Sequence, residues 1–127
     1  MGRSLAPMDA LRTLVPLAAL IAVCDLPWLA FVTPWARSMF QRVQGGAPME
    51  FRLAALPPIY LALAYLLSRT GSVRDAFFMG LAVYAVYDFT NLTTLSRYEL
   101  NFALSDSLWG GVLFAIARAA AERLGLL

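Results

Sequence analysis

The chain has 127 residues, of which 61% are apolar and 14% charged, with a formal net charge of +2. Soluble domains carry roughly 45–50% apolar and about 25% charged residues, and so small a domain has too much surface to hide this apolar excess. The composition excludes an ordinary soluble domain, and the small, scattered positive charge excludes a nucleic-acid-binding surface. We therefore expect one integral membrane domain over residues 1–127, with the lipid bilayer as its partner.

Two residue types narrow the chemistry further. There is no histidine, which removes the commonest metal ligand and the usual proton switch near neutral pH. Cys24 is the single cysteine, so an intrachain disulfide and a cysteine-based metal cluster are excluded.

The first membrane span is predicted over residues 13–33. Its apolar run is too long for the core of a signal peptide and fits the roughly 20 residues that a helix needs to cross the bilayer. A polar, glycine-containing loop over 34–50 follows it. The second span, over about 52–67, carries Pro57 and Pro58, which remove backbone donors and therefore predict a kink.

Two further spans follow, over residues 75–95 and 102–121. The predicted fold is thus an all-α, four-helix transmembrane bundle with short connections, apart from the loop over 34–50. Four crossings would place both termini on the same side of the membrane.

The arginines indicate which side that is. The side of the termini would hold six of them: Arg3, Arg12, Arg69, Arg74, Arg118 and Arg123. The opposite side would hold four: Arg37, Arg42, Arg52 and Arg97. The positive-inside rule then places both termini on the cytoplasmic or equivalent side of a bacterial or organellar inner membrane.

Three aspartates lie inside the predicted spans: Asp25, Asp88 and Asp106. A carboxylate at membrane depth is costly, and such residues usually face a bundle interior, a partner or a water-filled path. With a rise of about 1.5 Å per residue, they lie at about 18, 20 and 24 Å from the inner end of the bundle. We therefore expect the three side chains to face one another and form an acidic pocket.

Neighbouring residues support an inward orientation. Tyr84, Asp88 and Asn91 share one side of the third span at helical spacing, and Tyr87 flanks them. Trp28 and Trp109 each follow an aspartate on the first and fourth spans. The candidate ligand-binding residues are Asp25, Asp88, Asp106, Asn91, Tyr84, Tyr87, Trp109 and Trp28.

Clustered acids disfavour the fully ionised state, so the pocket is expected to hold a proton or a cation. Oxygen ligands suit a divalent cation such as Mg²⁺, Ca²⁺ or Mn²⁺, which Asp25, Asp88 and Asp106 would hold. An organic cation against Tyr84, Tyr87 and Trp109 is equally compatible. The simpler alternative is that each aspartate hydrogen-bonds to neighbouring groups and only fixes the packing of the helices.

Three strings resemble a known family. They are Tyr84-Ala-Val-Tyr-Asp-Phe-Thr-Asn91, Asp106-Ser-Leu-Trp-Gly110 and Asp25-Leu-Pro-Trp-Leu29. Together they are similar to the DUF2177 family of small predicted membrane proteins. The resemblance implies a four-helix membrane protein and assigns no activity.

Three functions remain open. The first is a non-enzymatic membrane protein whose acidic pocket binds a cation, a proton or a small polar ligand. The second is an accessory subunit of a larger membrane complex, formed with other subunits or with itself, which a ridge of small residues on the fourth span favours. The third is a membrane enzyme acting on a lipid, with Asp88 or Asp106 as acid or base.

Overall fold

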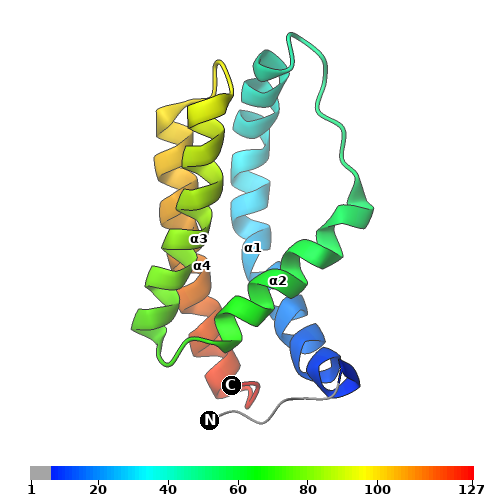
Figure 1. Ribbon diagram of the computed structural model, residues 1–127, viewed down its shortest axis with the longest axis vertical. Helices are drawn as coiled ribbons and strands as arrows, with labels where there is room; N and C mark the ends of the chain where they lie inside the picture. The colour runs from blue at the N-terminus through cyan, green and yellow to red at the C-terminus, as the bar shows by residue number, and fades with distance from the viewer. Residues whose placement is uncertain (1–6) are drawn as a thin grey trace.

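The computed structural model describes residues 7–127, so Arg3 of the charge comparison lies outside the described range. All the regular secondary structure in this part of the chain is helical and it contains no strand, which confirms the predicted all-α fold with four helices (Figure 1). The elements are α1 (Pro7–Val43), a short 3₁₀ helix η1 (Leu53–Ala55), α2 (Leu56–Ser68), α3 (Val73–Thr94) and α4 (Leu100–Arg123).

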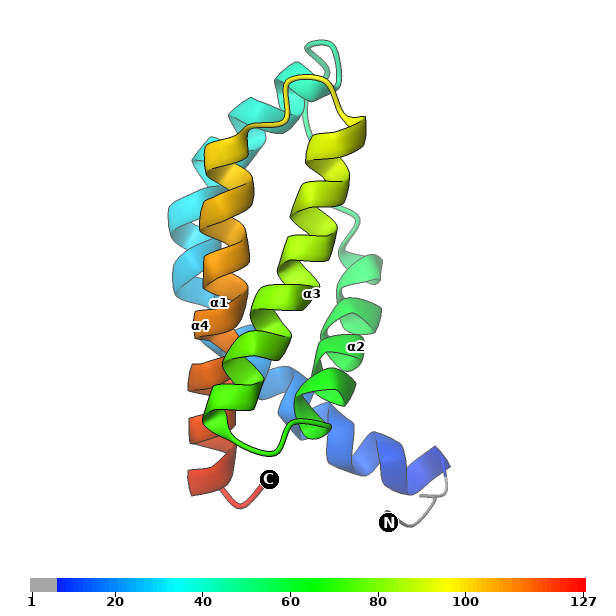
Figure 2. The same ribbon diagram turned by 60° about the vertical axis from the view of Figure 1, so that its left-hand side comes forward.

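Helix α1 is longer than the span predicted from the sequence. It contains 37 residues and continues through Pro34, so residues 34–43, expected in a loop, extend the helix. Each internal proline removes one backbone hydrogen bond and favours a bend. Figure 2 shows α1 changing direction between its blue and cyan parts. Leu17 in the first part and Met39 in the second are both fully buried, so each part of α1 packs against the bundle.

Helix α2 begins at the proline pair. Pro57 and Pro58 occupy its first turn, where a missing backbone N–H leaves no intrahelical hydrogen bond unmade. The predicted kink at these prolines therefore finds no support. The helix has 13 residues, about 20 Å at 1.5 Å per residue, which is less than the roughly 30 Å of a hydrocarbon core. Figure 1 shows the segment before it descending beside the bundle from the end of α1.

Helices α3 and α4 form an antiparallel hairpin (Figure 2). Ser72 caps α3 by accepting a hydrogen bond from the Asp75 amide at 3.1 Å. The turn into α4 contains Arg97 with φ 69°, a left-handed conformation that reverses the chain tightly. The two helices approach each other closely at Gly80 and Gly110, where an added Cβ on Gly80 would lie 2.1 Å from the Gly110 oxygen.

The outer surface of the bundle is apolar. Large exposed side chains include Leu26 and Phe31 on α1, Val86 on α3, and Leu104 and Leu108 on α4. Helices α1 and α4 are each long and apolar enough to cross a membrane. These exposed side chains are accommodated if lipid rather than water surrounds the bundle.

Arg118 fastens the loop between α2 and α3 to α4. Its guanidinium donates to the Thr70 carbonyl oxygen at 2.6 Å and to Glu122 Oε1 at 2.8 Å. We expect Arg118→Met, which keeps most of the apolar stem, to lower the free energy of unfolding by about 1–3 kcal/mol. Arg123→Met, at an exposed position on the same helix, is the matched control. Equal unfolding midpoints for the two variants in mild detergent would contradict the role of Arg118.

Candidate polar pocket

A polar layer crosses the bundle between two apolar clusters. The first cluster includes Leu17, Ile21 and Phe114, and the second includes Val32 and Phe102. Along the helices, the layer lies between them and contains Asp25 on α1, Asp88 on α3, and Asp106, Ser107 and Trp109 on α4. Apolar side chains therefore pack on both sides of the acidic residues along the bundle axis.

Asp25 is buried, with 5% of its surface exposed, and it accepts two hydrogen bonds. The Tyr60 hydroxyl of α2 donates to Oδ2 at 2.6 Å, and the Trp109 indole of α4 donates to Oδ1 at 2.7 Å. Charge-assisted hydrogen bonds of this kind offset part of the cost of burying a carboxylate. Asp25 thereby joins α1 to both α2 and α4.

The pairing of α1 and α4 is reciprocal. While Trp109 donates to Asp25, the Trp28 indole of α1 donates to Asp106 Oδ1 at 3.0 Å. The two indole rings stack with their centroids 5.5 Å apart and their planes at 12°. We call this arrangement of Asp25, Trp28, Asp106 and Trp109 the Asp–Trp clasp. It fixes both the spacing and the register of the two helices.

Asp88 is the most deeply buried of the three acids and has no exposed surface. The Tyr98 hydroxyl donates to its Oδ1 at 2.7 Å, and Ser107 Oγ approaches Oδ2 at 3.5 Å. Of the other two acids, Asp106 of α4 is the one that influences Asp88. Tyr98 reaches this position because the turn at Arg97 directs the chain back toward the bundle.

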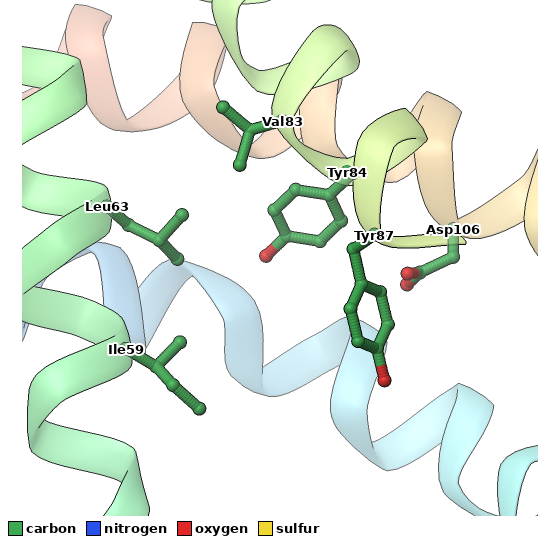
Figure 3. Close-up of a pocket in the computed structure, with 6 residues that line it drawn as sticks. All are labelled: Ile59, Leu63, Val83, Tyr84, Tyr87 and Asp106. Carbon is green, nitrogen blue, oxygen red and sulfur yellow. The ribbon is translucent and has the colours of Figure 1, made fainter. Parts of the chain in front are cut away.

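A cavity of about 260 Å³ lies beside the polar layer, between α2, α3 and α4. Figure 3 shows Ile59 and Leu63 of α2 facing Tyr84 and Tyr87 of α3, with the Asp106 carboxyl group directed toward the tyrosines. Val83 completes the lining of this cavity. Among the three aspartates, Asp106 is the one that lines it.

The predicted site residues thus lie in different parts of the polar layer. Asp106, Tyr84 and Tyr87 line the cavity. Asp25, Trp28 and Trp109 belong, with Asp106, to the Asp–Trp clasp, and Asp88 binds Tyr98. Asn91 lies beside the hydroxyl groups of Tyr87 and Tyr98.

The acids are not arranged as a cluster of metal ligands. Within residues 7–127, no three acidic or cysteine side chains are grouped so that they could hold a metal ion. The two ion pairs of this part of the chain, Arg42–Glu99 and Arg118–Glu122, involve none of the three aspartates. The partners of the acids are instead neutral donors: tyrosine, tryptophan and serine.

Tyr60, Tyr98 and Ser107 bind the aspartates, but sequence reasoning did not identify them as site residues. The sequence does contain a pattern that could have predicted the Asp–Trp clasp. The spacing Asp-x-x-Trp occurs at Asp25–Trp28 and again at Asp106–Trp109, and on antiparallel helices this spacing lets each tryptophan reach the opposite acid. Tyr60 and Tyr98 carry no comparable pattern.

Comparison with known proteins identifies a family. Searches of curated proteins and of solved structures found no match. The family model described as "Predicted membrane protein (DUF2177)" matches residues 10–122, which is nearly the whole chain. With its apolar surface and buried carboxylates, this protein belongs to the DUF2177 family of predicted membrane proteins.

Proposed function

We propose that this membrane protein is not an enzyme and that it binds a proton, a cation or a small polar ligand in the cavity at Asp106. The proposal depends mainly on a difference among the three acids. In the described residues, Asp25 and Asp88 each accept two side-chain hydrogen bonds, whereas Asp106 accepts one, from Trp28. Asp106 is also the acid that lines the cavity.

Charge supports the same proposal. Asp88 and Asp106 are neighbouring acids in the polar layer, and two neighbouring carboxylates held away from water repel each other. A proton between them or a cation in the cavity relieves this repulsion. Because Asp88 is fully buried, the Asp106 side is where an occupant can be exchanged.

We further propose that the chain crosses the membrane four times with both termini on the cytoplasmic side. The start of α1 and the end of α4 lie at the same end of the bundle (Figure 1). Arg12, Arg69, Arg118 and Arg123 lie near that end, on or beside the helix ends that meet there. Reporter fusions after Leu127 and within residues 44–50 test this topology, which requires opposite locations for the two reporters.

Unfolding of the purified protein in lipid nanodiscs tests the binding proposal. Lowering the pH, or adding Ca²⁺, Mg²⁺, Mn²⁺ or an organic cation, should raise the unfolding midpoint of the wild type, since an occupant stabilises the folded state that binds it. Asp106→Asn should lose this response. Asp75→Asn removes an exposed carboxylate on α3 and should retain it. A wild-type midpoint that is insensitive to every one of these additions rules the proposal out.

One observation favours a second function, that of a subunit in a larger membrane assembly. Residues 47–52 are non-helical, and the segment 44–55 is exposed apart from the partly covered Met49. Backbone polar groups facing lipid must be hydrogen-bonded, so this segment would require cover from another chain if it lies within the membrane. A photoreactive residue at Phe51 that crosslinks to protein in native membranes would support this function, and crosslinks to lipid alone would contradict it.

A further inference from the structure

The cavity at Asp106 also indicates what kind of molecule fits it. If the cavity is a binding site, as in the proposed function on which this rests, three of its properties restrict the ligand: the route by which it is reached, the charge that it offers, and the nature of its walls.

The route is lateral. Apolar clusters pack above and below the polar layer along the bundle axis, with Leu17 and Phe114 on one side and Met39 and Phe102 on the other. The cavity lies instead between α2 and α3, and its rim residues Ile59 and Tyr87 are 49% and 54% exposed. In a membrane this rim faces lipid, so an occupant enters from the hydrocarbon region and must itself be soluble there.

The charge offered is a single carboxyl group. Asp106 is the ionisable acid that lines the cavity, together with the weakly acidic hydroxyl groups of Tyr84 and Tyr87. One carboxylate balances one positive charge, and a divalent ion would remain undercompensated in such apolar surroundings. The tyrosine rings beside Asp106 (Figure 3) provide the π faces that attract organic ammonium groups.

The remaining walls are aliphatic: Ile59, Leu63 and Val83. They suit an alkyl chain, which would lie between α2 and α3 while its head group approaches Asp106. The volume of about 260 Å³ is slightly below the roughly 300–1,000 Å³ of drug-sized sites. The occupant is therefore small, with a short apolar tail inside the protein or a longer tail that continues into the lipid.

We infer that this cavity binds an amphiphilic organic monocation, of the alkylammonium class, that enters from the lipid between α2 and α3. The head group pairs with Asp106 against Tyr84 and Tyr87, and the alkyl chain contacts Ile59, Leu63 and Val83. Such binding combines an ion pair shielded from water with burial of the alkyl chain. The ligand therefore needs both its cationic head group and its alkyl chain.

Octyltrimethylammonium is a suitable probe, with octanesulfonate as the matched amphiphile of opposite charge. In nanodiscs, octyltrimethylammonium should raise the unfolding midpoint of the wild type at concentrations where octanesulfonate does not. Asp106→Asn should weaken its apparent affinity by about tenfold or more. Val83→Phe, which fills the cavity and leaves every polar contact in place, should abolish the effect, and Asp75→Asn should leave it unchanged.

Each other result overturns the inference. If protons or Mg²⁺ stabilise the wild type and octyltrimethylammonium does not, the ligand class is wrong while the proposed function stands. If both amphiphiles act equally on the wild type and on Val83→Phe, they act only by partitioning into lipid. If no addition changes the wild-type midpoint, the inference and the proposed function fail together. If Asp106→Asn does not fold, the test depends on Val83→Phe alone, and a Val83→Phe variant that still responds to octyltrimethylammonium overturns the inference.

Discussion

Replacing Gly110 with alanine is expected to separate α3 from α4 and to lower the free energy of unfolding by about 3 kcal/mol or more, at the upper end of the usual cost of overpacking. The new Cβ would lie 2.3 Å from Tyr84 Cγ and 2.6 Å from the Gly80 carbonyl oxygen. The backbone contact cannot be relieved by a side-chain rotation, so a whole helix must move. Because Tyr84 lines the cavity, the same movement should also weaken ligand binding there.

Gly111→Ala provides a matched control one residue along the same helix. Its Cβ would meet only the edge of the Phe77 ring, at 2.8 Å and beyond, and a ring can turn aside at lower cost. The expected order of destabilisation is Gly110→Ala above Gly111→Ala, measured as unfolding midpoints in one detergent. Gly80→Ala should resemble Gly110→Ala, since its Cβ meets the Gly110 oxygen. Equal effects at Gly110 and Gly111 would show that the close approach of the two backbones is unimportant.

Asp88→Leu is expected to improve membrane insertion and to weaken the folded bundle. Insertion should become more favourable because leucine replaces a carboxylate in the C-terminal half of α3 (Val73–Thr94). The same change is worth about 3 kcal/mol at a helix centre on insertion scales. The folded state should lose about 1–3 kcal/mol, because the buried Tyr98 hydroxyl and Ser107 lose their acceptor. Membrane-integrated protein is measured by alkaline extraction, and stability is measured by unfolding in detergent.

A double variant isolates the cause of this instability. Adding Tyr98→Phe to Asp88→Leu removes the orphaned hydroxyl, so the double variant should recover part of the lost stability. Asp88→Asn keeps an oxygen acceptor for Tyr98 and should be milder than Asp88→Leu. If Asp88→Leu is as stable as the wild type, the carboxylate has no part in holding the helices together.

The sequence predicted the number and type of the helices because each one is a mainly apolar run between polar segments. The helix boundaries were harder to predict, because a proline can either begin a helix or interrupt one. Pro34 was expected near the end of the first span, yet α1 continues to Val43. Pro57 and Pro58 were expected to bend the second span, yet they lie in the first turn of α2. Whether a proline begins, bends or ends a helix depends on the tertiary packing around it.

Less of the candidate site than of the fold could be predicted from the sequence. Their position inside apolar runs brought attention to Asp25, Asp88 and Asp106, because acids within a membrane span are rare and expensive. The partners of these acids come from other helices and from the turn at Arg97, and periodicity within one helix does not determine such contacts. Tyr60 and Tyr98 are examples: the length of α2 and the reversal at Arg97 position them.

The Asp–Trp clasp has a consequence for the order in which the protein assembles. It joins α1 and α4, the two helices that are long and apolar enough to cross a membrane. Independently inserted helices associate in a second stage, guided by packing and by polar contacts between them. These two helices therefore already carry their mutual recognition, and the short α2 is expected to dock afterwards through Tyr60.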